Sequence, residues 1–243
     1  MLQFSHENVV KIFGVAADRP PIMIVMEFCP YGSLDKYLQK NKGEVKTMDK
    51  LIIILDAAKG MEYLSTRPVP CIHRDLAIRN CLVGDKKQVK IADFGMSREG
   101  AYTLLNKKGT KIPIRWTAPE ALKKGRFTIK SDVYSFGILM WEIFENGELD
   151  PFPTADTHAD VYERLKKGEK NEKPTGATED IYNVMLHCWR SNPDRRPDFV
   201  ALRQVIQIMI KNTDSVSTTH ESSSTTTTGQ ESNKPTSTSD TKC

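Results

Sequence analysis

Residues 73–80 read His-Arg-Asp-Leu-Ala-Ile-Arg-Asn and place the carboxylate of Asp75 five positions before the carboxamide of Asn80. Phosphoryl transfer needs such a pair, because one group orients a hydroxyl nucleophile and another holds the cation that neutralises the phosphates. A second carboxylate follows in Asp93-Phe94-Gly95, thirteen residues after Asn80, and Ala118-Pro119-Glu120 begins 25 residues after Asp93. One tripeptide alone would be a weak signal, but this order and spacing predict phosphoryl-transfer chemistry.

The composition is that of an ordinary globular protein. The 243 residues are 39% hydrophobic and 27% charged, with a formal net charge of +4, which leaves room for one large domain or two small ones. Mild basicity alone would allow a nucleic-acid partner, but no zinc-ligand spacing or aromatic-basic interleaving supports one. No stretch reaches the ~18 apolar residues of a membrane span, and residues 1–8 do not resemble a secretory signal.

The cysteines are odd in number, scattered, and without the spacing of metal ligands. We therefore expect reduced thiols and a cytoplasmic protein. They are Cys29, Cys71, Cys81, Cys188 and Cys243.

Hydrophobic periodicity predicts a chain of mixed helices and strands. Residues 93–120 have no sustained period, and an irregular stretch of that length inside a domain tends to be functional. Strands are predicted at 9–15, 22–27, 80–83 and 88–92, and helices at 34–40, 48–65, 131–145, 158–167, 180–189 and 198–211.

The composition changes at residue 213. Eighteen of the 31 residues from 213 to 243 are Ser or Thr, and Val216 is the only branched aliphatic residue. Such a segment buries too little apolar surface to offset its ordering entropy, so we expect 213–243 to be a disordered tail.

Several motifs resemble those of a protein tyrosine kinase. After Asp75, serine/threonine kinases typically carry a Lys two positions on, whereas this chain has Ala77 there and a cation at Arg79. Residues 113–120, Pro-Ile-Arg-Trp-Thr-Ala-Pro-Glu, are similar to the tyrosine-kinase substrate platform, and residues 132–142 resemble the central buried helix. Residues 93–99, Asp-Phe-Gly-Met-Ser-Arg-Glu, lean toward the cytoplasmic, non-receptor Fes/Fer-like subgroup.

The resemblance implies an α+β, protein-kinase-like fold with a mainly helical C-lobe and a truncated β N-lobe remnant. It divides the chain into an N-lobe remnant and hinge (1–29), the C-lobe (30–212) and the tail (213–243). It implies transfer of the ATP γ-phosphate to tyrosine hydroxyls of protein substrates, with ATP and magnesium (Mg2+) as cofactors, and it leaves oligomeric state open.

The same resemblance implies roles for individual residues. Asp75 orients the tyrosine hydroxyl, Arg79 stabilises negative charge near the phosphate, and Asn80 and Asp93 ligate Mg2+. Met26 falls at the gatekeeper position, Glu27 and Cys29 offer backbone groups to adenine, and Leu82 lies beneath the base. For Met26 and Leu82, plain core packing remains an equal alternative.

Other residues are implied in regulation and in the scaffold. Tyr102 is the autophosphorylation candidate, and its phosphate would pair with Arg74; an ordinary exposed loop tyrosine is the alternative. Asp132 is expected to accept hydrogen bonds from the backbone of the 73–80 loop, and Glu120 to pair with Arg196.

The chain departs from the family pattern in its N-terminal part. Neither Gly-x-Gly-x-x-Gly nor Val-Ala-x-Lys occurs anywhere in residues 1–243. Without a phosphate-covering loop and the strand lysine, a charge-assisted bond of ~1.5–3 kcal/mol is missing. We therefore expect this chain to be weak or inactive in transfer by itself. The alternative is a non-catalytic, kinase-like binding module or scaffold.

Overall fold

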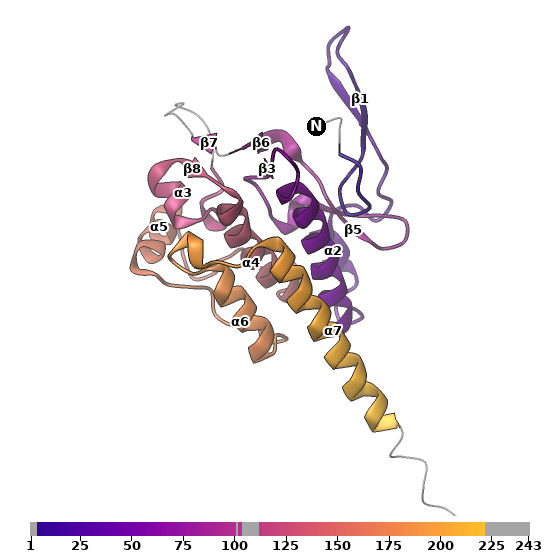
Figure 1. Cartoon of the computed structure of the whole chain (residues 1–243), viewed down its shortest axis with the longest axis vertical. Helices are drawn as coiled ribbons and strands as arrows, with labels where there is room; N and C mark the ends of the chain where they lie inside the picture. Colours follow the sequence, from indigo (N-terminus) through magenta and orange to yellow (C-terminus); the bar gives the residue numbers. More distant parts are fainter. Residues whose placement is uncertain (1–3, 101, 104–111, 222–243) are drawn as a thin grey trace, which may run out of the picture.

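The computed structural model describes residues 4–100, 102–103 and 112–221, with side chains at all of them except 102–103 and 214–221. A helical body carries a two-stranded β-hairpin that projects from one end, while the last helix runs past the body at the other end (Figure 1). This mixture of many helices with a few short strands confirms the predicted α+β class.

The helices begin and end close to where the periodicity placed them. Two agree at both ends, and three more agree to within two residues at each end. The α-helices are α1 (Leu34–Lys40), α2 (Thr47–Ser65), α3 (Pro119–Lys124), α4 (Ile129–Phe144), α5 (His158–Lys167), α6 (Glu179–Cys188) and α7 (Phe199–Glu221). Single 3-10 turns are η1 (Ile78–Asn80), η2 (Phe94–Met96), η3 (Ile114–Trp116) and η4 (Pro193–Arg195).

The strands form antiparallel pairs, and the four predicted strands are present but shorter than expected. The irregular stretch 93–120 contains short elements, two of which pair with strands outside it. The pairs are β1 (Ile12–Ala16) with β2 (Met23–Met26), β3 (Cys71–Ile72) with β6 (Arg98–Glu99), β4 (Cys81–Val83) with β5 (Val89–Ile91), and β7 (Tyr102–Thr103) with β8 (Arg126–Phe127).

Helix α4 is the centre of the core. Every residue from Ser131 to Phe144 is buried, as expected for a helix that is apolar on nearly all sides. At Gly137, an added Cβ would stand 2.7 Å from both Cys188 Cβ and Trp189 Nε1. The C-terminal end of α6 therefore packs directly on the backbone of α4.

Helix α2 connects the body to the N-terminal segment. At Gly60, an added Cβ would collide with the carbonyl oxygen of Asn8 and stand 2.9 Å from Ile91 Cγ1. Asn8 is itself buried, and its side chain donates to the carbonyl of Val89 at 2.9 Å. The close approach of these three segments fixes β5, and the residues that follow it, against the helical body.

Helix α7 extends ten residues beyond its predicted end at Lys211. It continues to Glu221, so the first nine residues of the predicted tail are helical in backbone. Helix propagation adds one backbone hydrogen bond per residue once a helix is nucleated, which outweighs the weak preference of Ser and Thr for other conformations. The rest of the predicted tail, 222–243, lies outside the described residues.

Among the residues that the structure describes, no helix combines the length and the apolar composition needed to cross a bilayer.

Candidate active site

A buried carboxylate binds the backbone at the start of the 73–80 loop. Asp132 Oδ2 accepts the backbone N–H of His73 at 2.7 Å, and its Oδ1 accepts that of Arg74 at 3.0 Å. Asp132 is 1% exposed, and burial raises its pKa to about 7 against the lowering effect of these two N–H donors. Arg74 adopts a positive φ of 71°, in the region that glycine prefers, and the paired hydrogen bonds hold it there. The predicted role of Asp132 is confirmed.

Asp75 lies at the surface end of this loop, tied to both of its predicted neighbours. Its backbone carbonyl accepts Asn80 Nδ2 at 2.7 Å, and its carboxylate Oδ1 forms an ion pair with Arg79 at 2.5 Å. The Arg79 guanidinium lies 4.3 Å from the centre of the Trp116 ring, in a cation-π contact. Asp75 is therefore positioned from one side by an amide and from the other by a cation.

Asp93 is brought to the same place through the residue before it. The N–H of Ala92 donates to the carbonyl of Asn80 at 2.9 Å, and the carbonyl of Ala92 contacts His73 Nε2 at 2.9 Å. Asp93 itself adopts φ 56° and ψ 73°, and its side chain accepts the N–H of Gly95 at 3.2 Å. Asp93 is thus held next to Asn80 through Ala92, and Asn80 in turn bonds Asp75, so the two sequence segments meet at the His73–Ala92 contact.

The His73 ring is an internal support for this meeting point. It is completely buried, burial lowers its pKa, and its ring packs 5.3 Å from that of Phe94. Phe94 in turn packs 5.2 Å from Phe4, near the start of the described chain. A neutral imidazole at this position supports Asp75 and Asp93 without adding a competing cation.

The donor set at Asn80 and Asp93 fits Mg2+. The amide of Asn80 uses its nitrogen to bind Asp75, which leaves the side-chain oxygen to face a cation. Within the described residues, no three His, Cys, Asp or Glu side chains gather as a complete metal cage. One carboxylate and one amide are typical of Mg2+ sites, because this ion keeps several waters and takes its other ligands from substrate phosphates.

A second buried carboxylate, Glu142, was missed by the sequence reasoning. Its Oε2 accepts the backbone N–H of Ile78 at 3.0 Å, and burial raises its pKa to about 7. It fixes the far end of the loop, just before Arg79 and Asn80. An acidic residue inside an otherwise apolar helix was the available signal, as it was for Asp132.

Glu120 and Arg196 form the ion pair that was predicted. Arg196 Nη1 and Nη2 donate to the two carboxylate oxygens of Glu120 at 2.6 and 2.7 Å. The Arg196 side chain is fully buried, and its guanidinium also donates to the carbonyls of Lys130 and Arg190. The pair ties α3 to α4 and to η4.

The predicted adenine residues lie at the base of the hairpin. Met26 is 45% exposed. Cys29 is buried with Val10 and Ala92, and Leu82 packs against that small cluster. The Glu27 carboxylate accepts the backbone N–H of Lys11 at 2.9 Å and pairs with Lys90 at 3.1 Å, which fixes the chain at this point.

The predicted regulatory residues lie on neighbouring segments. The backbone of Tyr102 pairs with Phe127 across β7 and β8, while its side chain is outside the described residues. The Arg74 guanidinium stacks 4.6 Å from the Phe127 ring and donates to the carbonyl of Met96 at 2.9 Å. Arg74 therefore lies beside the strand that pairs with Tyr102.

Known proteins resemble this chain over most of its length. Tyrosine-protein kinase Fer of Mus musculus is 42% identical over 210 residues, which cover 86% of this chain and 25% of Fer. The transforming protein Abl of Abelson murine leukemia virus is 43% identical over 213 residues, 87% of this chain and 28% of that protein. The transforming protein Fps of avian sarcoma virus is 43% identical over 206 residues, 83% of this chain and 38% of that protein.

The chain thus spans between a quarter and two fifths of the length of these relatives. Fer and Fps are among them, as the motif of residues 93–99 predicted, and Abl is equally similar. The family model for protein tyrosine and serine/threonine kinases matches residues 1–206. With this match, and with Asp75, Asn80 and Asp93 gathered at one place, the chain belongs to the protein tyrosine and serine/threonine kinase family.

Proposed function

We propose that this chain is catalytic-domain sequence of a protein tyrosine kinase, which transfers the γ-phosphate of ATP to tyrosine hydroxyls of protein substrates. The observation that carries the proposal is the meeting of Asp75, Asn80 and Asp93 around the contact between His73 and Ala92. Fer, Abl and Fps are all named tyrosine-protein kinases, which supports the choice of tyrosine.

Asp75 is the catalytic residue that accepts a hydrogen bond from the substrate hydroxyl and orients its oxygen toward the phosphate. Arg79 acts on charge, because its guanidinium lies against Asp75 and its side chain remains 38% exposed. Its stacking on Trp116 fixes the direction of its N–H donors. Ala77 stands where serine/threonine kinases typically carry a lysine, and Arg79 supplies the cation beside Asp75.

Asn80 and Asp93 are the proposed magnesium ligands, and the bound ion supplies neutralisation of phosphate charge. The left-handed backbone of Asp93 aims its carboxylate, with one oxygen held by Gly95. Backbone strain of this kind is typical of functional sites. The side-chain amide of Asn80 donates a hydrogen bond to the carbonyl of Asp75, so both ligands are oriented before any cation binds.

Adenine is proposed to lie against Leu82 and the backbone of Glu27 and Cys29, with Met26 at the gatekeeper position. The nearness of Leu82 to Cys29, which lie in one small cluster, supports this position. Residues 1–29 act as the N-lobe remnant and hinge, residues 30–212 as the C-lobe, and the tail follows. With Met26 open to solvent, residues 1–243 are expected to hold ATP weakly by themselves.

Regulation is proposed to act through Tyr102. Its strand pairs with β8, and Arg74 stacks on Phe127 of that same strand. A phosphate on Tyr102 would pair with the Arg74 guanidinium on the neighbouring segment. We propose a cytoplasmic protein, as expected for relatives of this kind and for reduced cysteines.

The test is a transfer assay with two proteins. One is residues 1–243. The other is a chimaera in which the kinase segment of mouse Fer that precedes its match to this chain is joined to residue 1, to supply the phosphate-covering loop. We expect phosphotyrosine on a Glu-Tyr copolymer from the chimaera only, and its loss in the Asp75→Asn variant of the chimaera. Phosphoserine as the main product, or equal activity with Asp75→Asn, would overturn the proposal.

A further inference from the structure

Cationic side chains surround the buried ion pair of Glu120 and Arg196. The pair is internally neutralised, because two guanidinium nitrogens of Arg196 donate to the Glu120 carboxylate. Three segments meet at it, namely the end of α3, the connection from α5 to α6, and the connection from α6 to α7. We call the surface that they form the basic face, and its cations are Lys123, Lys124, Lys170, Arg190 and Arg195.

The contacts of Arg196 place two of these segments side by side. Its guanidinium donates to the carbonyl of Arg190 at 2.9 Å, and Arg190 Nη1 donates to the carbonyl of Arg195 at 2.8 Å. The two lysines of α3 follow the carboxylate of the pair by three and four positions, so they lie on the same side of that helix. The cations of α3 and of the last connection therefore border the same pair.

Lys170 approaches the pair from the third segment. It is partly buried, and its pKa is lowered first by burial and then by the charge of Arg196, while the charge of Glu120 raises it. In the part of the chain that the structure describes, its ammonium group has no hydrogen bond and no ion pair. Because a buried charge without a partner costs free energy, this lysine would gain from an anion outside the chain.

The other cations of the basic face also lack a counter-charge. Among the described residues, no ion pair includes any of them. The adjoining segment carries Asp194 and Asp198, and Asp198 accepts the backbone N–H of Ala201 at 2.8 Å, at the start of α7. The face thus has an excess of positive charge, which raises the local concentration of anions.

We propose that the basic face binds an acidic segment of a protein partner, in which Asp or Glu carboxylates follow one another along an extended chain. The cations come from three segments around the central pair, so they suit several separate charges rather than one compact anion. Arg190 and Arg195 present planar groups whose paired N–H donors match a carboxylate. Lys123 and Lys124 add flexible point charges from α3.

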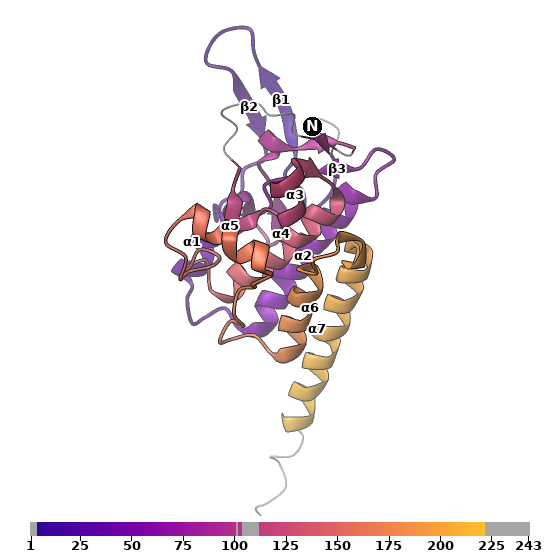
Figure 2. The same cartoon turned by 90° about the vertical axis from the view of Figure 1, so that its left-hand side faces the viewer.

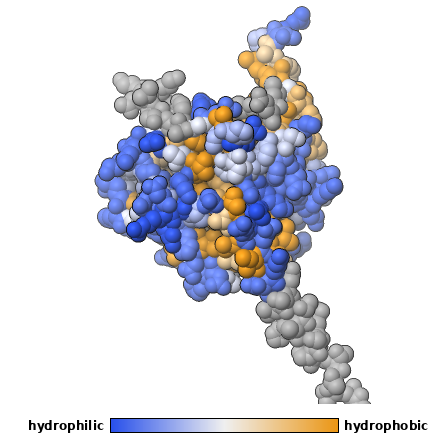
Figure 3. All heavy atoms as spheres, in the orientation of Figure 1, coloured by the Kyte–Doolittle hydropathy of each residue, from blue (hydrophilic) through white to orange (hydrophobic). Residues whose placement is uncertain are grey.

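The same face lacks the features with which proteins bind membranes or nucleic acids. None of the large apolar residues exposed in the described part of the chain belongs to the three segments. The side that carries α3 and α5 in Figure 1 faces the viewer in Figure 2, and the left of the space-filling view is mainly hydrophilic (Figure 3). Stable attachment to a bilayer needs an apolar or lipid anchor besides positive charge, and single-stranded nucleic acid is bound by exposed aromatic rings. The charge pattern therefore favours an acidic protein segment.

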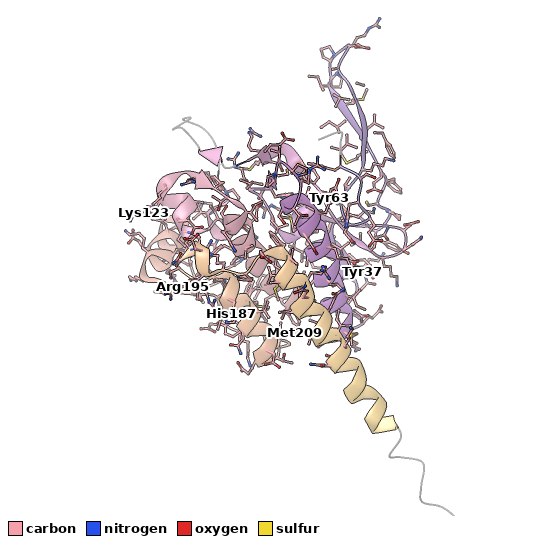
Figure 4. The ribbon with its side chains drawn as sticks, viewed as in Figure 1. Tyr37, Tyr63, Lys123, His187, Arg195 and Met209 are labelled. Atoms are coloured by element: carbon pink, nitrogen blue, oxygen red, sulfur yellow. The ribbon has the colours of Figure 1, made fainter. Side chains whose placement is uncertain are left out.

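The test measures the binding of a fluorescein-labelled decaglutamate peptide to residues 1–243 by fluorescence anisotropy. The variant carries Lys123→Gln, Lys170→Met and Arg195→Gln. The matched control carries Lys36→Gln, Lys40→Gln and Lys86→Gln, which remove the same charge from exposed positions elsewhere. In Figure 4, Tyr37 marks helix α1, which carries two of the control positions, on the other side of the body from Lys123 and Arg195.

We expect the variant to bind the peptide about tenfold more weakly than wild type, and the control to bind within about twofold of wild type. Binding should weaken as salt is raised from about 0.05 to about 0.15 M, because salt screens exposed charges. Equal losses in the variant and the control, or no binding by wild type at the lower salt, would overturn the proposal. Phosphatidylserine vesicles and an oligothymidylate are the other two probes, and tighter binding of either one than of the peptide would overturn the choice of a protein segment.

Lys170→Met alone tests whether this lysine lacks a counter-charge. Methionine keeps an unbranched apolar stem and removes the charge. We expect the urea midpoint of the free chain to rise, while the peptide binds more weakly. A lower midpoint, or unchanged peptide binding, would count against the proposal. None of these outcomes depends on kinase activity, so they are separate from the test of the proposed function.

Discussion

The Asp132 carboxylate and the backbone N–H of His73 are joined by a hydrogen bond of 2.7 Å between residues 59 positions apart in the chain. Asp132 lies on the buried helix α4, and His73 begins the loop that carries Asp75 and Asn80. The loop is thus attached to the buried central helix of the body. A second buried carboxylate on α4, that of Glu142, accepts the backbone N–H of Ile78 near the other end of the same loop.

Stability should depend on pH through these two carboxylates. Burial raises the pKa of both Asp132 and Glu142 to about 7, above values near 4 for the exposed groups. Between about pH 4 and pH 7 the folded chain therefore binds more protons than the unfolded chain. Their contribution to the free energy of unfolding is full below that window and falls as pH rises through it, by up to about 1.4 kcal/mol per pH unit for each group.

The variant Asp132→Asn separates the pH dependence due to Asp132 from that due to His73. Burial lowers the pKa of His73, so its contribution to the free energy of unfolding grows as pH rises. In urea unfolding, the stability of wild type relative to Asp132→Asn should decrease from about pH 5 to pH 7 and then level. A difference that stays constant, or grows, over this range would contradict the raised pKa of Asp132.

The buried pair of Glu120 and Arg196 should matter far more than an exposed pair. Glu120→Gln leaves the fully buried Arg196 guanidinium without its counter-charge, so we expect a loss of about 3–5 kcal/mol in the free energy of unfolding. The matched control is Glu163→Gln, which removes the exposed pair with Lys166 and should change the stability little, because solvent screens this pair. Equal losses in the two variants would show that burial does not set the strength of the Glu120 pair.

Gly60→Ala tests the packing of α2 on the N-terminal segment. Helix propensity alone predicts that an Ala at this position stabilises the chain by about 1 kcal/mol. The added Cβ, however, would collide with the carbonyl of Asn8, and overpacking of this kind costs about 1–3 kcal/mol. We therefore expect a net loss in thermal unfolding, whereas Gly14→Ala, with no atom near its new Cβ, should change little. A stabilised Gly60→Ala variant would place Asn8 elsewhere.

Arg79→Lys tests the contact with Trp116. Lysine retains the charge beside Asp75 but lacks the planar group that stacks on the indole ring. In the chimaera with the Fer segment, we expect kcat/KM for a tyrosine peptide to fall about tenfold, equivalent to ~1.4 kcal/mol. Lys166→Arg, at a distant exposed pair, should have no effect. Unchanged activity of Arg79→Lys would mean that charge alone is required at this position.

The regular elements could be predicted from the sequence because their signals are local. Hydrophobic periodicity predicted α1 and α5 at both ends, and in the structure Thr157 accepts the N–H of Asp160 at the start of α5. The position of the N-terminal segment, in contrast, depends on a long-range contact. His6 stacks on Tyr63, labelled in Figure 4, near the C-terminal end of α2. Such a contact joins two segments that no local pattern connects.

The supports of the site were predictable only in part, since Asp132 and the pair of Glu120 with Arg196 were expected and Glu142 was not. The motifs around Asp75 and Asp93 have distinctive spacing, whereas Glu142 is one acidic residue in an apolar helix, 64 positions from its partner Ile78. The pairing of β7 with β8 was also missed, because strands of two residues carry no period. The end of α7 was misjudged since composition predicts the absence of a core, while helix propagation depends on backbone hydrogen bonds.

The most direct test of the central claim is paramagnetic NMR on residues 1–243 with ADP and Mn2+ in place of Mg2+. If Asn80 and Asp93 hold one cation beside Asp75, amide signals of residues 75–81 and 92–95 should broaden together as Mn2+ is added. Asp93→Asn should abolish both effects, whereas Asp160→Asn on α5 should abolish neither. Broadening of one segment without the other, or broadening that persists in Asp93→Asn, would contradict a shared cation site.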